Sequence, residues 1–133
     1  MPQKEIERIS LANHLALVVC RGKTGDPRQL SDLARAIYLT YYLQGYGYGD
    51  APVDLYQRAK LAVDSANARG RQHGIWTVDA SDAATLEEVL RIQDQQLAVA
   101  PVRTLLLAQA RLEKYSHNDD PSPIPEYLGP VSA

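Results

Sequence analysis

The fold of this chain is decided by the stretch GDPRQLSDLARAIYLTYYLQG, residues 25–45. Asp26 can cap the free amides at the start of a helix, and Pro27 suits the first helical position. Apolar side chains then recur at the three- and four-residue spacing of a helix that buries one face; they are Leu30, Leu33, Ala34, Ile37, Tyr38 and Tyr41. Gly45 ends the pattern. The stretch therefore predicts a core-facing helix over about 27–45.

Two later stretches combine a start signal with the same apolar spacing. One begins near Asp50 and Pro52, ends at Gly70, and is predicted to bury an alanine-rich face. Its apolar positions are Leu55, Ala59, Ala62, Val63 and Ala66. The other runs from Ser81 to about residue 98, with Ser81 or the Thr85-x-x-Glu88 box as its cap. Its apolar positions are Leu86, Val89, Leu90 and Leu97.

Pro101 interrupts the helical pattern that starts at Ser81. A proline inside a helix removes one hydrogen bond and clashes with the preceding turn, so we expect either a kink or a new helix there. The apolar stripe of the segment that follows consists of Leu105, Ala108, Leu112 and Tyr115. The chain thus has a further predicted helix ending near residue 115.

Residues 3–21 are open to two interpretations. Ile6, Ile9 and Leu17 stand at helical spacing, whereas residues 15–20 are apolar nearly all round and could form a buried strand. We favour a helix, because the segment is long and lacks glycine and proline. Residues 75–78 alternate too briefly to form a sheet without a partner strand.

Together these segments predict an all-α fold, a four- to five-helix antiparallel bundle. A single domain is expected over residues 1–115, with connections at 22–27, 45–50 and 70–80. Residues 116–133 contain four prolines and few large apolar residues, so we expect an extended or mobile tail.

Composition limits the classes of protein to which the chain can belong. Its 133 residues carry a formal net charge of −2, so no global positive field attracts nucleic acid or anionic lipid. The apolar run at 15–20 is far shorter than the ~20 residues of a membrane span, and the charged start does not resemble a signal peptide. We therefore expect a cytoplasmic protein without membrane contact.

Cys20, the one cysteine, cannot form an internal disulfide and is expected in the core.

No motif for catalysis, a cofactor or a metal stands out. The run 45–49 (GYGYG) follows a predicted helix rather than a strand, and the Gly-Lys-Thr at 22–24 lacks the first glycine of a phosphate-binding loop. His14, His73 and His117 are far apart and form no metal-binding pair on a helix. We expect neither enzymatic activity nor a cofactor.

Tyrosine is the unusual residue of this sequence. The chain has eight tyrosines and no phenylalanine, and six of the tyrosines fall between residues 38 and 56. Tyr38 and Tyr41 fit the predicted core stripe. We expect four others to form a surface that binds a protein partner or a second copy, because tyrosine is common at interfaces. These four are Tyr42, Tyr46, Tyr48 and Tyr56. In the alternative interpretation, the loop folds back and its tyrosines cover helix ends.

From these features we expect a non-catalytic interaction or regulatory protein that forms a homodimer and contacts its partner through the tyrosine-rich connection. The alternative is a small nucleic-acid-binding regulator that contacts phosphates through Arg69, Arg71, Arg103 and Arg111. A second alternative is a small-ligand binder or enzyme with an enclosed pocket, which the sequence cannot locate.

Three segments carry a family resemblance: LARAIY at 33–38, the Gly-Tyr-Gly run, and DQQL at 94–97 shortly before Pro101. In this combination the chain resembles uncharacterised small all-helical proteins of proteobacteria, some of which are labelled Fis-type regulators. The resemblance implies a helical fold and, under that label, DNA binding. The chain departs from such regulators at 100–105 (APVRTL), which lacks the turn of a helix-turn-helix motif.

Overall fold

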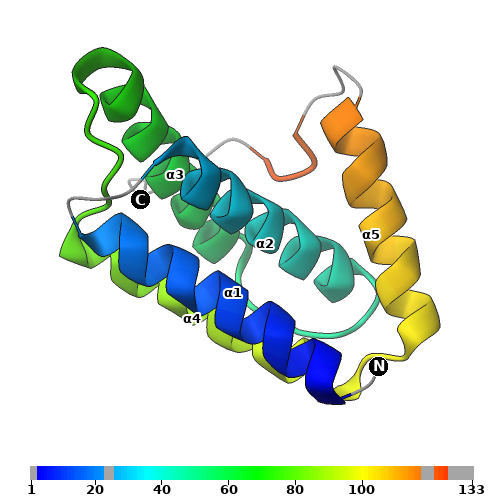
Figure 1. The fold of residues 1–133 in the computed structure, drawn as a ribbon. Helices are drawn as coiled ribbons and strands as arrows, with labels where there is room; N and C mark the ends of the chain where they lie inside the picture. Colours follow the sequence, from blue (N-terminus) through cyan, green and yellow to red (C-terminus); the bar gives the residue numbers. More distant parts are fainter. Residues whose placement is uncertain (1–2, 23–25, 118–121, 126–133) are drawn as a thin grey trace.

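Five α-helices make up most of the described part of the chain (Figure 1). The structure is a computed structural model that describes residues 3–22, 26–117 and 122–125, and no strand occurs within those ranges. The helices are α1 (Gln3–Arg21), α2 (Pro27–Gly45), α3 (Val53–His73), α4 (Ala80–Val99) and α5 (Val102–His117). The predicted all-α class is confirmed, and residues 3–21 are a helix rather than a strand.

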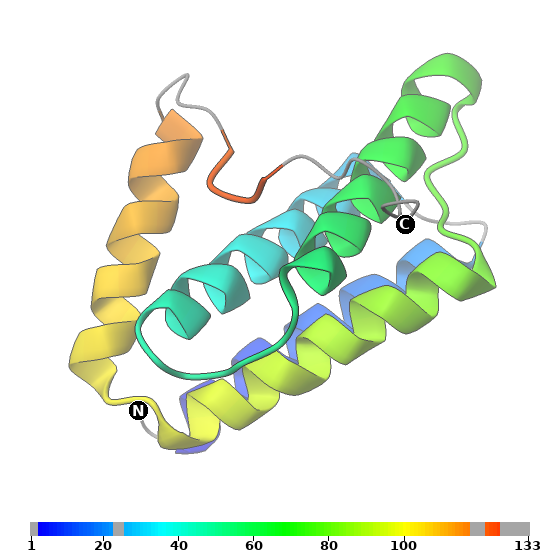
Figure 2. The same cartoon turned by 180° about the vertical axis from the view of Figure 1, so that it is seen from behind.

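The helix predicted from residues 25–45 is the centre of the bundle. α2 contacts all four other helices, and α1 to α4 each run antiparallel to the next in the chain (Figures 1 and 2). α5 is inclined to the others and packs against the C-terminal half of α2. Because neighbours surround α2, it is buried on more than the one predicted face. The antiparallel bundle is confirmed.

The core has two parts. The larger cluster lies among α1, α2, α3 and α4 and includes the fully buried Cys20 and Tyr56. The smaller joins α5 to α2 through Leu39, Leu43 and Leu105. Burial of Cys20 was predicted. Exclusion of water, together with the nearby carboxylates, raises the pKa of its thiol to about 11.

Helix caps explain most of the element boundaries. Asp26 caps α2 as predicted: its Oδ1 accepts a hydrogen bond from the Arg28 amide at 2.7 Å. α4 is capped instead by Asp79, not by Ser81. The predicted end of α3 at Gly70 is wrong, because the helix continues to His73 and stops at Gly74, whose φ of 71° is the left-handed conformation favoured by glycine.

Residues 74–79 connect α3 to α4 without forming a strand. The Val78 amide donates a hydrogen bond to the Cys20 carbonyl at 2.9 Å, which ties this connection to the end of α1. The Trp76 indole packs directly on Gly70, and a side chain at position 70 would overlap the ring. Gly70 therefore serves close packing inside α3 and does not mark the end of the helix, as the sequence had suggested.

Part of the predicted tail lies on the bundle. Ile124 is buried in the larger core cluster, the Ser122 and Tyr38 hydroxyls are 3.3 Å apart, and the Gln57 amide donates to the Pro125 carbonyl at 3.1 Å. Residues 122–125 thus form neither helix nor strand, but they pack on the bundle. Residues 118–121 and 126–133 lie outside the described part of the chain.

Candidate functional site

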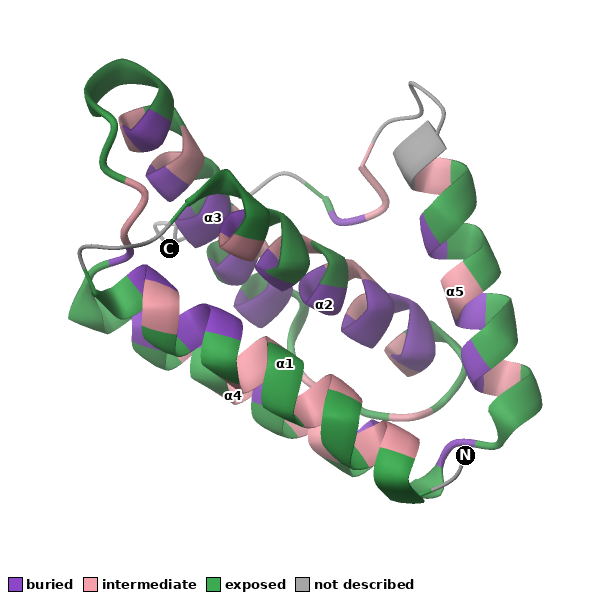
Figure 3. Cartoon of the chain, viewed as in Figure 1, coloured by how far each residue is buried: buried purple, intermediate pink, exposed green. Residues whose placement is uncertain are grey.

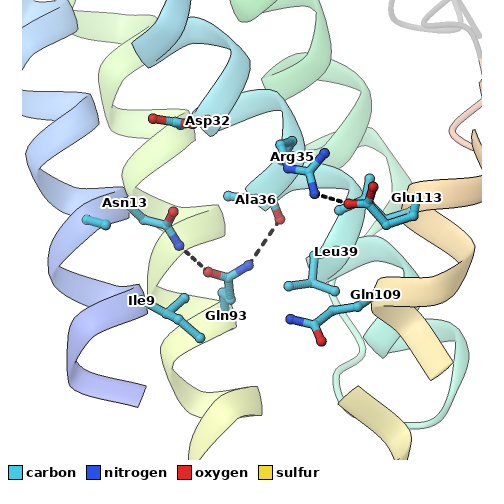
Figure 4. Close-up of a pocket in the computed structure, with 11 residues that line it drawn as sticks. Ile9, Asn13, Asp32, Arg35, Ala36, Leu39, Gln93, Gln109 and Glu113 are labelled. Atoms are coloured by element: carbon cyan, nitrogen blue, oxygen red, sulfur yellow. Dashed lines mark hydrogen bonds and ion pairs between the residues drawn. The ribbon is translucent and has the colours of Figure 1, made fainter. Parts of the chain in front are cut away.

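Two features of the described surface stand out: a cleft and an apolar helix face. The cleft has a volume of about 480 Å³ and lies between α1 and α5, with α2 and α4 beneath it (Figure 4). Apolar groups from α1, α2 and α5 form part of its lining, and they are Ile9, Ala12, Ala36, Leu39 and Leu112. Six polar side chains complete it, from Asn13, Asp32, Arg35, Gln93, Gln109 and Glu113.

The floor of the cleft is an amide network. Gln93, only 1% exposed, accepts a hydrogen bond from the Asn13 side-chain amide. Its own Nε2 donates to the Ala36 carbonyl (Figure 4) and to the Thr40 hydroxyl, each at 3.3 Å. Both polar atoms of Gln93 therefore have partners, as a buried amide requires. The network joins α1, α2 and α4.

Charge in the cleft is slightly negative. Arg35 on α2 forms an ion pair with Glu113 on α5 across one end (Figure 4). Asp32 adds a carboxylate that has no ion pair among the described residues, so two negative groups and one positive give a lining charge of −1. The lining offers carboxylates and amides but neither a cysteine nor a histidine.

The second feature is the outer face of α1, defined by Leu11, Leu15 and Val18. Their side chains are 61%, 53% and 63% exposed, and they follow one another at the i, i+4, i+7 spacing of a single helix face. On the opposite side, Ala16 and Leu17 are buried in the core. Figure 3 shows exposed positions recurring along α1, whereas buried positions predominate in the C-terminal half of α2. α1 is thus apolar on both sides but covered on one.

Two of the four tyrosines predicted for a partner surface belong to the interior. Tyr56 is 0% exposed, and its hydroxyl donates to Gln44 Oε1 at 2.8 Å. Burial, with a smaller effect of Tyr41, raises the pKa of Tyr56 to about 12. Tyr42 is also buried, because α5 packs on the side of α2 that faces away from the predicted stripe. The expectation that Tyr42 and Tyr56 are surface residues is corrected.

The other two tyrosines lie at the α2–α3 connection. Tyr46 is 38% exposed, and the Arg111 guanidinium lies 5.7 Å from its ring centroid and 4.7 Å from that of Tyr42. Tyr48 is half-buried, and its carbonyl accepts a hydrogen bond from Gln96 at 2.7 Å. The loop thus folds back over helix ends, as the alternative interpretation proposed, and Tyr46 alone of the four is an exposed side chain.

The four arginines assigned to nucleic acid do not share one surface. Arg69 donates to the Thr77 carbonyl at 2.7 Å and so holds the connection after α3, while Arg71 is exposed nearby. Arg103 and Arg111 are on α5, at the opposite end of the molecule from the C-terminal end of α3 (Figures 1 and 2). Arg111 also stacks on tyrosine. The structure brings these residues together only as two separate pairs.

Histidine and cysteine form no metal centre in the described ranges, where no group of three or more potential ligands occurs. His14 pairs with Asp94, with 2.9 Å between Nε2 and Oδ2, so it links α1 to α4 at the edge of the core. None of the helices described here is both long and apolar enough to cross a membrane.

Neither the cleft nor the exposed outer face of α1 could be predicted from the sequence, for different reasons. The apolar outer face of α1 was visible in the all-round apolar run at 15–20, but that run was equally consistent with complete burial. The cleft had no local signal, because Asn13 and Gln93 are eighty residues apart and meet only in the folded chain.

Comparison with known proteins finds no relative of this chain. No protein-family model matches the chain, and neither a curated protein nor a solved structure shows significant similarity to it. The resemblance to small proteobacterial proteins with Fis-type labels therefore stays a prediction.

Proposed function

We propose that this chain is a non-catalytic interaction protein that associates with itself through the outer face of α1. One observation carries the proposal: Leu11, Leu15 and Val18 are each more than half exposed, although they form one continuous apolar face. Helices that are apolar all round are normally covered on all sides, and contiguous apolar patches on soluble proteins mark interaction sites. A second molecule covering this face would remove these side chains from water.

The sequence predicts self-association through the tyrosines. The proposal moves it to α1, because Tyr42 and Tyr56 are buried and Arg111 stacks beside Tyr46. Stable interfaces bury about 800 Å² per partner. Three apolar side chains are the centre of a smaller contact, so we expect reversible association that depends on protein concentration.

Sedimentation equilibrium of the wild-type protein and the Leu15→Glu variant tests this proposal. A carboxylate in the middle of an apolar interface stays unpaired and costs its full desolvation, so the variant should be monomeric at concentrations where the wild type is dimeric. Leu61→Glu is the matched control, because Leu61 is similarly exposed, 49%, but lies on α3. A monomeric wild type, or equal weakening by both variants, would contradict the proposal.

Small-ligand binding is a second candidate function, favoured by the cleft. Its volume of about 480 Å³ lies in the range of ligand sites, and its lining charge of −1 with apolar walls suits a small organic cation. Titration with butylammonium, followed by NMR of the Asn13 and Gln109 side-chain amides, tests this function. Saturable shifts that disappear in Asp32→Asn would support it, and unchanged spectra would exclude this class of ligand.

Nucleic-acid binding has weaker support, because the arginines form two separate pairs and Arg69 and Arg111 are engaged within the chain. Adding a random DNA duplex to the sedimentation samples tests it. Salt-sensitive binding that is lost in Arg71→Glu and Arg103→Glu would favour this alternative.

A further inference from the structure

We infer that two copies pair their α1 helices antiparallel, so that Glu7 of each copy faces Arg21 of the other. The inference rests on the proposed self-association and adds its geometry. It depends on two features of α1: the position of the apolar face along the helix and the distribution of charge beside that face.

The apolar face is centred near residues 14 and 15. Leu11 and Val18 stand at its ends and Leu15 lies close to its middle, all exposed on one side of α1. If a second α1 crosses antiparallel over this centre, Leu11 lies opposite Val18 of the second copy, and the Leu15 side chains meet near the twofold axis. Such a contact is self-complementary, as a twofold interface requires.

Charged residues stand before and after the apolar face on the same helix. Before it, Glu5 and Arg8 form an ion pair with each other. Glu7 precedes the apolar face and Arg21 follows it; both are exposed, and fourteen residues, close to four helical turns, separate them. They therefore lie on the same flank of α1. Glu7 accepts one hydrogen bond, from Gln3 at 3.3 Å, and Arg21 has no ion pair among the described residues. Each can therefore meet an opposite charge on a second copy.

Helix direction decides which charges meet. A twofold axis between antiparallel helices brings the same flank of both copies together, so Glu7 and Arg21 form two equivalent pairs. In a parallel arrangement the twofold axis runs along the helices and brings opposite flanks together. Glu7 and Arg21 would then stand about four turns apart and on opposite sides of the contact, so they could not pair, and the two helix dipoles would be aligned. The charges thus favour the antiparallel arrangement. Because the pairs are exposed, salt should weaken this preference.

A charge swap tests the direction by sedimentation equilibrium at low and moderate salt. Glu7→Arg or Arg21→Glu alone places like charges opposite each other twice, and each should raise the dimer Kd by about tenfold at low salt. The double variant Glu7→Arg/Arg21→Glu should return the Kd to near the wild-type value. Arg71→Glu, an exposed reversal at the end of α3, is the control and should leave the Kd unchanged.

Disulfide trapping provides a second measurement that does not depend on the strength of an ion pair. Equal amounts of Glu7→Cys and Arg21→Cys proteins are mixed and oxidised, and the products are separated by mass. Random pairing of equal amounts already gives half mixed disulfide and a quarter of each homodisulfide, so antiparallel pairing predicts a mixed fraction well above one half. The native Cys20 is buried and should not compete.

The outcomes separate this inference from the proposed function. A wild-type protein that stays monomeric overturns both. A dimer that is lost in Leu15→Glu supports self-association through α1. If the double charge variant of that dimer is no tighter than the single variants, or if the mixed disulfide does not exceed one half of the products, the antiparallel geometry is overturned while the proposed function stands.

Discussion

Replacing Gly70 with alanine tests how the connection after α3 is held. Gly70 lies inside α3 with a negative φ, so alanine should improve helix formation by about 0.5–1 kcal/mol. The new Cβ would lie 2.5 Å from Trp76 Cζ3 and closer still to Cδ2 and Cε3. All three separations are much shorter than a van der Waals contact, so the side chain and the ring would overlap. Such overpacking costs roughly 1–3 kcal/mol. We expect the steric cost to win and the free energy of unfolding to fall by about 1–2 kcal/mol.

Gly45→Ala is the matched control, because Gly45 is also helical but a Cβ there meets nothing within 4 Å. It should stabilise the protein by about 0.4–1 kcal/mol. Guanidinium unfolding followed by circular dichroism measures both variants. Trp76 is the one tryptophan, so its emission reports displacement of the ring and should shift to the red in Gly70→Ala. Equal stabilisation by both variants, with unchanged emission, would refute the reasoning.

Three further predictions concern buried polar groups. Gln93→Leu removes the hydrogen bonds of Gln93 with Asn13 and Thr40, so it should lower the free energy of unfolding by about 1–3 kcal/mol, measured in urea. An unchanged urea midpoint would contradict a structural role of the amide network. Tyr56→Phe removes only the hydrogen bond to Gln44 and should cost about 0.5–1.5 kcal/mol, a larger loss indicating a repacked core. Cys20 has a pKa raised by burial from 9.0 to about 11, so the unfolded chain loses this proton first. The contribution of Cys20 to stability should be fully present below pH 9 and be lost as the pH rises toward about 11. Thermal unfolding across that pH range measures the loss, and a stability that rises with pH would contradict the raised pKa.

Several parts of the fold could be predicted because they depend on neighbouring residues. The Asp26 cap, the spacing from Leu30 to Ile37, and the break at Pro101 all act within one or two helical turns. Errors arose where a local signal had a distant cause. Gly70 reads as a helix end, but it lies inside α3, where the Trp76 indole packs so closely that a side chain would not fit.

The candidate site could be predicted only in part. The sequence marked the run at 15–20 as apolar, yet it did not say which of those side chains face water. It also placed Tyr42 on the surface, because no local feature shows that α5 packs against the far side of α2. The amide network has no local pattern at all, since Asn13 and Gln93 come from α1 and α4.

The helices, their order and most of their ends follow from the sequence, because caps, proline and apolar spacing act between residues a few positions apart. Only the tertiary structure decided that α2 is central, that Tyr42 and Gln93 are buried, and that Leu15 stays exposed. Burial depends on which helices pack around a side chain, and that packing joins segments far apart in the sequence.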